Sequence, residues 1–464
     1  MKIVMKFGGT SVGNGEKILH VAKLLKSYYD KGDQVVMVTS ALAGVTDSLL
    51  NAADQACREG KVSSVSSFIA ELSQKHYDAV RDSIADPKIQ DEVISYLQQR
   101  IDELEKILVG ICYLGELSPR SKDNISSFGE RLAAPIVSGA IRSLGIKSKH
   151  YTGGEIGMIT TDVFGNARPL PGTYERIGAV LIPGLGDSIQ VVTGFIGESE
   201  DGSITTLGRS GSDYSASIIG VGFGADEIWL WKEVDGIMTA NPKVIPSAKT
   251  INLISYNEAI ELASLGAEVL HPRAIEPAMG RNTPVRVKST FKPDFEGTLV
   301  AAESKRSKNI VKSISTIRRI ALINASSVEM VGTAGQIGRL FTALTADRIS
   351  VRLVSQGSES SISFVVNETD AEKAVRAIRN EFGDHLQVDY RTDVNVVAIV
   401  GDGMAGTPGI ARRFFATLGE RNINIIMISQ GSSQYSISCV IETKNVSEAV
   451  EALHREYELE NVND

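Results

Sequence analysis

The chain opens with an apolar strand that runs directly into a lysine and a glycine-rich turn, and this order constrains the fold more than any other feature. The residues read MKIVMKFGGTSVGNGEK, with Lys6 at the strand end and a helix expected from about Gly15. Strand and helix patterns continue to alternate in the residues that follow. Such alternation predicts an α/β fold with a mostly parallel sheet and ligands at the carboxyl ends of its strands.

The glycine turn has the properties of a phosphate site. Gly8, Gly9 and Gly13 let backbone amides approach an anion, Lys6 adds a positive charge, and the following helix directs its positive end inward. The spacing matches neither the Walker pattern nor GxGxxG, which disfavours a P-loop NTPase and a Rossmann dehydrogenase. A simple strand-to-helix turn with a solvated lysine is the alternative interpretation.

Length and charge narrow the class of protein. The 464 residues exceed what one hydrophobic core serves, so two or three domains are expected. A net charge of -8 without a basic cluster argues against nucleic acid or an anionic membrane as partner. The 3 cysteines lack metal or disulfide spacing, and the sequence has neither a signal-peptide core nor a membrane-spanning apolar run. These features predict a cytoplasmic protein that acts on small molecules.

Two later segments place charged residues at the starts of helices. In SSFGERL, Glu130 either faces a ligand or merely caps its helix. In TLGRSGSDYSA, Arg209 offers a planar fork for a carboxylate or phosphate. Asp213 in the same segment can face a metal ion or orient a lysine. A solvated polar turn is the competing interpretation of this second segment.

The C-terminal third contains an internal repeat. LVSQGSESSISFVV, which begins at Leu353, matches MISQGSSQYSISCVI, which begins at Met427. Each copy predicts a strand, a glycine-rich loop, a helix, two strands and a helix, with the loops at 331–338 and 402–409. Two such copies can pair edge to edge in one sheet. Amides at the helix starts favour a pair that binds an amino-acid carboxylate over one that only mediates dimerisation.

The motifs KFGGTSV, SALAGVTD, SFGERL, TLGRSGSDYSA, WKEVDGI and GAEVLHPRA follow one another in the order found in aspartate kinases, and the chain resembles that family over nearly its whole length. The resemblance implies an amino-acid kinase fold, which is a carbamate-kinase-like three-layer sandwich, followed by two βαββαβ ACT domains. It also implies the monofunctional form, because the sequence ends soon after the second copy. The expected parts are a catalytic domain at 1–302 with a largely helical insertion at 52–125, a linker with a short strand at 303–316, and ACT domains at 317–390 and 391–464.

The same resemblance implies a role for individual residues. Lys6 and Asp213 would be catalytic, with Lys6 at the transferring phosphates and Asp213 holding the lysine or a metal. Around aspartate it implies Ser40, Thr46, Glu130, Arg209 and Ser212. Of these, Arg209 would take the α-carboxylate and Glu130 the ammonium. Against ATP it implies Lys6, Gly8, Gly9, Ser11, Lys232, Glu233, Met238, Lys243 and Glu268. Around an effector amino acid it implies Gly332, Ala334, Gly335, Ile337 and Gln356.

The implied reaction moves the γ-phosphoryl group of ATP to the β-carboxylate of L-aspartate, which gives 4-phospho-L-aspartate and ADP on the route to lysine, threonine and methionine. Because that carboxylate is already ionised at neutral pH, no general base is needed, in keeping with the lack of a His or Cys constellation. Mg²⁺ is expected with ATP, and no separate metal site of the protein is expected.

Threonine is expected as feedback effector in preference to lysine, because GDGMAGTPGIA in the second copy resembles threonine-responsive relatives. A homo-oligomer formed through the ACT domains, a dimer or a dimer of dimers, is also expected. Two other functions remain open at this point. One is a glutamate or N-acetylglutamate kinase of the same fold, and the other is a non-catalytic amino-acid sensor.

Overall fold

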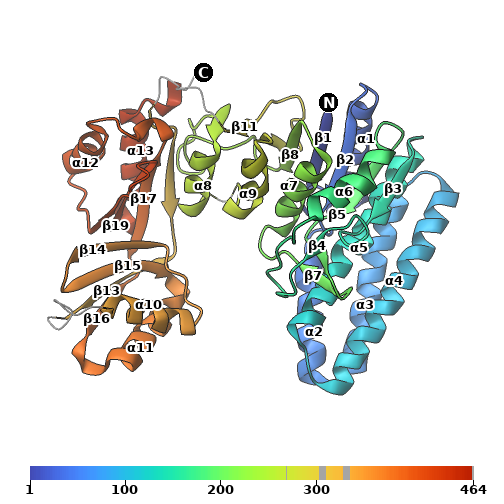
Figure 1. The fold of residues 1–464 in the computed structure, drawn as a ribbon, viewed down its shortest axis with the longest axis horizontal. Helices are drawn as coiled ribbons and strands as arrows, with labels where there is room; N and C mark the ends of the chain where they lie inside the picture. Colours follow the sequence, from blue (N-terminus) through green and yellow to red (C-terminus); the bar gives the residue numbers. More distant parts are fainter. Residues whose placement is uncertain (268, 303–309, 328–334, 462–464) are drawn as a thin grey trace. The chain divides into compact units, whose positions relative to one another are not determined.

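The computed structural model of the chain describes residues 1–267, 269–302, 310–327 and 335–461 (Figure 1). The chain divides into two compact units. The first unit contains Met1–Gly236 and Arg273–Ala302, and the second contains Ile237–Pro272 and Glu303–Asp464. Residues 303–309 of the expected linker and the effector residues Gly332 and Ala334 lie outside the described residues. The domain boundaries expected from the sequence stay a prediction.

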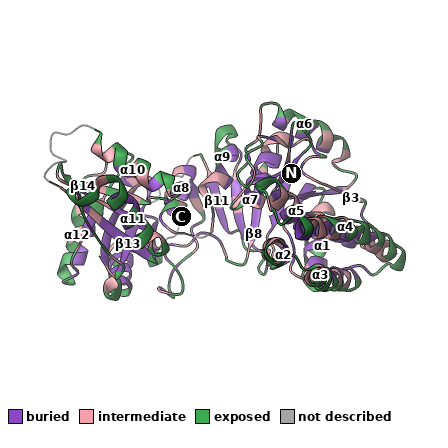
Figure 2. Cartoon of the chain, turned by 90° about the horizontal axis from the view of Figure 1, so that it is seen from below, coloured by how far each residue is buried: buried purple, intermediate pink, exposed green. Residues whose placement is uncertain are grey.

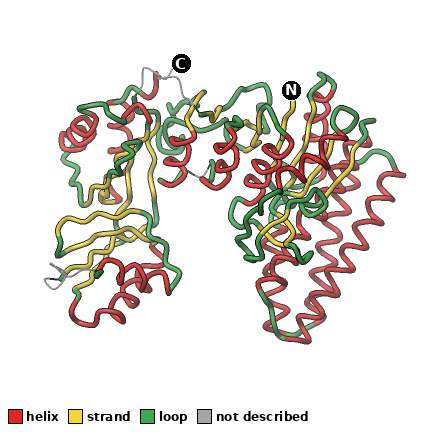
Figure 3. Tube along the Cα trace, viewed as in Figure 1, coloured by secondary structure: helices red, strands yellow, loops and turns green. Residues whose placement is uncertain are grey.

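The first unit alternates strands and helices (Figure 3). Its strands are β1 (Lys2–Phe7), β2 (Gln34–Thr39), β3 (Ser148–Tyr151), β4 (Ile159–Thr160), β5 (Ile189–Thr193), β6 (Ile196–Ser199), β7 (Ile204–Thr206), β8 (Glu227–Lys232), β10 (Val285–Ser289) and β11 (Thr298–Ala301). Its helices are α1 (Gly15–Tyr29), α2 (Val45–Glu59), α3 (Val62–Ser83), α4 (Pro87–Leu114), α5 (Pro119–Ser143), α6 (Thr173–Leu181), α7 (Gly211–Phe223) and α9 (Pro272–Arg281), whose first residue lies at the junction of the units.

A mostly parallel sheet forms the centre of the first unit, which confirms the predicted fold class. Its strands follow the order β3-β5-β2-β1-β8-β10-β11, and each neighbouring pair is parallel except β10 with β11. Nearly every residue of β1 and β2 is buried. The neighbouring strand β8 is buried except at its two ends (Figure 2). Strands covered on both faces have no polar side, which is why β1 and β2 appear in the sequence as unbroken apolar runs.

The helices α2 to α5 form a bundle in the first unit. Helix α3 packs against α4, and both α2 and α4 pack against α5, which in turn covers β3 and β5. One continuous apolar core joins this bundle to the sheet. Because α5 is buried along most of its length between bundle and sheet, it can hold side chains in a fixed position at the strand ends.

The second unit contains both copies of the repeat. Its strands are β9 (Leu253–Ser255), β12 (Ser313–Ile317), β13 (Ile320–Ser326), β14 (Leu353–Ser358), β15 (Ser361–Asn367), β16 (Gln387–Arg391), β17 (Val394–Val400), β18 (Met427–Ser429) and β19 (Ser436–Glu442). Its helices are α8 (Tyr256–Ser264), α10 (Gln336–Ala346), α11 (Ala371–Phe382), α12 (Ile410–Glu420) and α13 (Val446–Glu456). Gly335 and Gly409, which the repeat aligns, both precede a helix with left-handed backbone, at φ 85° and 91°.

The two copies form two antiparallel sheets that differ in how they are completed. The first copy builds β14-β15-β13-β16 from its own residues. The second builds β12-β17-β19-β18, so its edge strand β12 precedes the whole first copy in the sequence. The first copy is therefore nested between two strands of the second. Strand β12 takes the edge position that β16 holds in the first sheet.

The segment Ile237–Pro272 packs against the second copy. Ala240, Ile245 and Ala248 belong to the same apolar core as strands β17 and β19. The buried Glu258 carboxylate pairs with Lys312 at 3.2 Å and accepts a hydrogen bond of 2.8 Å from the backbone nitrogen of Asp402. This segment is thus part of the second unit in packing, although it lies between two parts of the first unit in sequence.

A histidine is buried in the helical bundle. The His76 side chain in α3 is fully buried, with Nδ1 2.7 Å from the carbonyl oxygen of Leu72. Its Nε2 has no hydrogen-bond partner in the described part of the chain. Burial disfavours the charged imidazolium and lowers the pKa of His76 to about 4.

We expect His76 to make the protein sensitive to mild acid. Between pH 6.5 and about 4, His76 is protonated in the unfolded chain but stays neutral in the folded protein. The free energy of unfolding therefore decreases as the pH falls. At pH 5 the loss should be about 2 kcal/mol relative to pH 7. In urea unfolding, the free energy of unfolding of His76→Leu should decrease between pH 7 and pH 5 by about 2 kcal/mol less than that of the unchanged protein. The exposed His385→Gln serves as control, and equal pH dependence in His76→Leu and the unchanged protein would contradict the prediction.

Candidate active site

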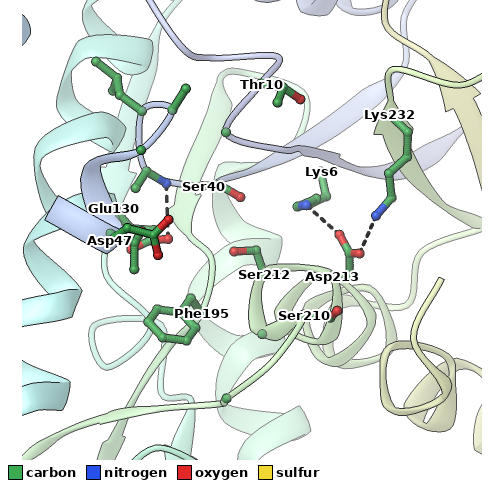
Figure 4. A pocket seen from close by; sticks show the side chains of 18 residues that line it. Lys6, Thr10, Ser40, Asp47, Glu130, Phe195, Ser210, Ser212, Asp213 and Lys232 are labelled. Atoms are coloured by element: carbon green, nitrogen blue, oxygen red, sulfur yellow. Dashed lines mark hydrogen bonds and ion pairs between the residues drawn. The ribbon is translucent and has the colours of Figure 1, made fainter. Parts of the chain in front are cut away.

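A cavity of about 510 Å³ lies at the carboxyl ends of β1, β2 and β8, beside the first turn of α7 (Figure 4). Lys6 reaches it from β1, Ser40 from the residue after β2, and Lys232 from the end of β8. Ser212 and Asp213 come from the start of α7. These strands are neighbours in the sheet, so the fold gathers residues from distant parts of the sequence at the edge where parallel sheets bind ligands.

Asp213 forms ion pairs with two lysines in this cavity. Lys6 Nζ lies 2.6 Å from Asp213 Oδ1, and Lys232 Nζ lies 2.6 Å from Asp213 Oδ2 (Figure 4). The side chains of Lys6 and Asp213 are only 8% and 5% exposed, whereas that of Lys232 is 22% exposed. The carboxylate therefore holds two ammonium groups at the cavity wall, and Lys232 is the more accessible of the two.

The charges of this trio favour an anionic ligand. Burial alone would raise the pKa of Asp213, but the ammonium groups of Lys6 and Lys232 outweigh it and hold that pKa well below its usual value. Asp213 is then ionised at neutral pH. Burial lowers the pKa of Lys6, and the carboxylate of Asp213 opposes that shift by favouring the ammonium form. When both ammonium groups are present, the trio carries one net positive charge. In low-dielectric surroundings such a charge attracts an anion more strongly than it would in water.

Glu130 lines the other side of the cavity with one oxygen available. The backbone nitrogen of Ala41 donates to Glu130 Oε1 at 3.2 Å, and Oε2 has no hydrogen-bond partner among the described residues. Gly129 permits this approach of α5, because a Cβ there would lie 2.7 Å from the Cβ of Ala41. Burial raises the pKa of Glu130 to about 8. A buried carboxyl group with a free oxygen is suited to a cationic ligand group.

The start of α7 forms part of the wall of the same cavity. The turn from Gly208 to Ser212 lines the wall, and both Gly208 and Ser210 have left-handed backbone, at φ 78° and 55°. The Ser210 side chain does not cap the helix. Because the first turn of a helix has unpaired N–H groups and a positive dipole end, this turn is suited to a carboxylate or phosphate.

The structure brings together eight of the residues that the sequence suggested for catalysis or for aspartate and ATP. The cavity is lined by Lys6, Gly9, Ser40, Thr46, Glu130, Ser212, Asp213 and Lys232. The glycine-rich loop of the opening motif is thus adjacent to the charged trio, and the two motifs SFGERL and TLGRSGSDYSA, which left bland alternatives open, both contribute to one cavity.

Other suggested residues are not in the wall of this cavity. Arg209 is exposed at the turn before α7, and the hydroxyl oxygen of Ser11 points to that of Thr290 at 2.9 Å. Gly8 immediately precedes the lining residue Gly9, and Glu233 is exposed after β8. Met238 and Lys243 belong to the second unit, and Glu268 lies outside the described residues.

The described effector residues lie in the first copy of the repeat. Gly335 precedes α10, Ile337 packs against the apolar core of that copy, and Gln356 is exposed on β14. Gln356 lies on the edge strand of its sheet, so it is accessible to a ligand.

Three lining residues with polar or aromatic side chains were missed by the sequence reasoning. They are Thr10, Asp47 and Phe195. Thr10 and Asp47 lie inside motifs already singled out, so their position in KFGGTSV and SALAGVTD was a usable signal. Ser210, which also lines the cavity, belongs to the serines of TLGRSGSDYSA that were expected to donate hydrogen bonds. Phe195 follows β5 and has an unusual φ of 69°, which no sequence pattern indicated.

Side chains of the types that bind metal ions are not grouped into a metal site in the described part of the chain. Within the described ranges, no three His, Cys, Asp or Glu side chains are grouped in a way that could hold a metal. Both oxygens of Asp213 are already paired with ammonium groups. The arrangement fits anion binding by cations and amides better than binding of a metal by carboxylates.

Comparison with protein families places the chain among known sequences. Residues 1–289 match the model of the amino acid kinase family, and residues 323–382 and 397–457 each match an ACT domain. The chain is 34% identical over 467 aligned positions to chloroplastic aspartokinase 1 of Arabidopsis thaliana, covering 98% of this chain and 80% of that protein. It is 32% identical to the aspartokinase of Schizosaccharomyces pombe, covering 98% and 92%.

Solved structures agree with this placement. Aspartokinase III of E. coli in complex with lysine and aspartate matches with a TM-score of 0.83 at 26% identity, covering 98% of this chain and 99% of that one. The same enzyme in complex with aspartate and ADP matches with a TM-score of 0.80 at 26% identity, with equal coverage. In the part of the chain that the structure describes, no helix combines the length and apolar character needed to cross a membrane.

Proposed function

The chain belongs to the aspartokinases, a group of kinases within the amino acid kinase family, and we propose on this basis that it transfers the γ-phosphoryl group of ATP to the β-carboxylate of L-aspartate. The products are 4-phospho-L-aspartate and ADP. The observation that carries the proposal is the pairing of Asp213 with Lys6 and Lys232, opposite a Glu130 oxygen that has no partner among the described residues. One wall suits phosphates and the other suits the ammonium of an amino acid.

Catalysis in this site depends on charge and position. The β-carboxylate of aspartate is ionised at neutral pH, so it attacks phosphorus without a general base. The obstacle is repulsion between two anions. Lys6 and Lys232 offset that repulsion, and Asp213 keeps both ammonium groups in fixed positions, so the site needs little reorganisation as charge develops on the transferring group.

The amino-acid substrate is held by groups on the opposite side. Glu130 pairs with the α-ammonium, and Ser40, Thr46 and Ser212 donate hydrogen bonds. The α-carboxylate lies at the amides of the α7 turn. Arg209 adjoins this turn with an exposed side chain, and we assign it to the α-carboxylate in the substrate complex.

ATP lies with its phosphates over the loop of Gly8 and Gly9 and against Lys6. The remaining nucleotide contacts that we propose are Ser11, Lys232, Glu233, Met238, Lys243 and Glu268. Mg²⁺ enters as the complex with ATP. Both oxygens of Asp213 are paired with lysines, so Mg²⁺ would be held by the phosphate oxygens of ATP.

The ACT pair supplies feedback control. We propose that an effector amino acid binds the first copy at Gly332, Ala334, Gly335, Ile337 and Gln356, and that threonine fits this role better than lysine. An effector inhibits only if it binds the inactive state more tightly than the active one. We further propose that the protein is cytoplasmic and forms a homodimer or a dimer of dimers through its ACT sheets.

The first test is a hydroxylamine trap, which converts acyl phosphates into coloured hydroxamates. With Mg-ATP, L-aspartate should give hydroxamate, whereas glutamate and N-acetylglutamate should not. Lys6→Ala should lower the rate at least about a hundredfold, because it removes a buried cation at the transferring phosphate. Lys23→Ala, on the exposed side of α1, should leave the rate unchanged.

The negative outcomes of that test are informative. Hydroxamate from glutamate or N-acetylglutamate in place of aspartate would make the protein a different amino-acid kinase. No hydroxamate from any substrate, with ATP still bound, would favour a non-catalytic sensor.

The raised pKa of Glu130 predicts a pH dependence of aspartate use. Below pH 8 the carboxyl is mostly protonated and must lose a proton to pair with the substrate ammonium, so kcat/KM for aspartate should increase from pH 6 to pH 8. The increase should approach about tenfold per pH unit. Glu130→Gln should lower kcat/KM about tenfold or more at pH 8 and remove this pH dependence. A Glu130→Gln variant whose pH profile parallels that of the unchanged protein would refute the assignment.

Effector choice is tested in the same assay. Added threonine should suppress hydroxamate formation at least about tenfold, and lysine should not. Gln356→Ala should raise the threonine concentration needed for half-maximal inhibition, whereas Gln430→Ala, at the equivalent position of the second copy, should not. Suppression by lysine alone would make lysine the effector. If Gln356→Ala and Gln430→Ala changed inhibition by threonine equally, the assignment of the effector site to the first copy would be wrong.

A further inference from the structure

Arg273 joins two loops of the catalytic unit. Arg273 is the second residue of α9, and the chain returns to this unit at Arg273. Its Nη1 donates to the carbonyl oxygen of Leu207 at 3.0 Å and also to Asn166 Oδ1. Its Nη2 donates to the carbonyl oxygen of Ala167 at 2.7 Å. The guanidinium carbon lies 4.8 Å from the centre of the Tyr214 ring, on the first turns of α7.

These contacts fall directly beside the turn that lines the cavity. Leu207 precedes the Gly208–Ser212 turn, and a Cβ added at Gly208 would lie 2.8 Å from the carbonyl oxygen of Gly165. The two loops are also bonded to each other, since the nitrogen of Ala167 donates to the carbonyl oxygen of Thr206 at 3.0 Å. The turn therefore has little room to shift while Arg273 remains in place.

Asp123 holds the same loops through a second set of contacts. Its carboxylate accepts hydrogen bonds from the backbone nitrogens of Thr206 at 2.7 Å and Gly165 at 2.9 Å, and from the Thr206 hydroxyl at 2.9 Å. Asp123 lies on α5, two turns before Glu130. The helix that carries Glu130 and the helix that carries Arg273 thus hold the α7 turn between them.

We infer that Arg273 is a positioning residue for aspartate binding. It sets the orientation of the Gly208–Ser212 turn and thereby the direction of the backbone amides that receive the substrate carboxylate. The inference rests on the proposed function. The side chain reaches two loops and stacks on Tyr214 at once, and this combination requires the planar fork of arginine. A lysine has three donors on one nitrogen and no planar fork, so it cannot place two separate nitrogens against the two loops while stacking on Tyr214.

The kinetic test compares Arg273→Ala and Arg273→Lys with Arg281→Ala, an exposed residue at the end of the same helix. Both Arg273 variants should raise KM for aspartate about ten- to a hundredfold and leave KM for ATP within about twofold, because the turn is assigned to the carboxylate of aspartate and the phosphates of ATP to Lys6 and the loop of Gly8 and Gly9. Arg281→Ala should change neither. Equal increases in both KM values, or unchanged KM for aspartate in folded variants, would overturn the inference.

A second readout is independent of activity. Trypsin cleaves after Arg209, which is exposed within the turn, so the rate of cleavage there reports how firmly the turn is held. Arg273→Ala and Arg273→Lys should be cut faster at Arg209 than the unchanged protein, and Arg281→Ala should not. If aspartate proves not to be a substrate, the proposed function fails while this rate still decides the role of Arg273. Cleavage at Arg209 that is no faster in either Arg273 variant would overturn it.

Discussion

The architecture of the candidate active site depends on one carboxylate that pairs with two lysines. Lys6 and Lys232 reach from the adjacent parallel strands β1 and β8, and without Asp213 between them their like charges would repel in a largely buried setting. Removal of one partner from a buried ion pair leaves an uncompensated charge, which costs several kcal/mol. Folding of the sheet and assembly of this cationic wall of the cavity are therefore coupled, because the same contact serves both.

The sequence predicted which residues belong to this site better than it predicted which residues contact one another there. Lys6 and Asp213 lie in local motifs in which glycines and helix starts are visible in one dimension. Glu130 was expected at a helix start but lies in the middle of α5, and the structure places all three residues in one cavity. Lys232 was expected only as a nucleotide contact. Its position beside Lys6 follows from the adjacency of β1 and β8, which are separated by over half of the catalytic unit, and there both lysines reach Asp213. The mostly parallel sheet was predicted from the alternation of strand and helix patterns, and the repeat from the match between two segments of the sequence; its assignment to ACT domains came from the resemblance to aspartate kinases.

Features that depend on non-local contacts could not be predicted in the same way. Arg273 appears within GAEVLHPRA as one charged residue among many, and only the folded chain shows its contacts with Leu207 and Ala167. The role of β12 was also invisible. It lies directly before β13 in the sequence, as β16 lies directly before β17, yet β12 pairs with β17 and β16 pairs with β13. A short strand with alternating serines indicates a sheet edge but does not say which sheet it joins.

The nested position of β12 has a consequence for the order in which this chain can fold during synthesis. Ser313 pairs with Val400, so β12 leaves the ribosome well before its partner strand β17 exists. The first copy needs no residue beyond β16 and can close its own sheet in the meantime. The second sheet is then the last to form, and it draws the two ends of the first copy together. Shortening the chain before β17 would leave β12 as an unpaired strand open to association with other chains.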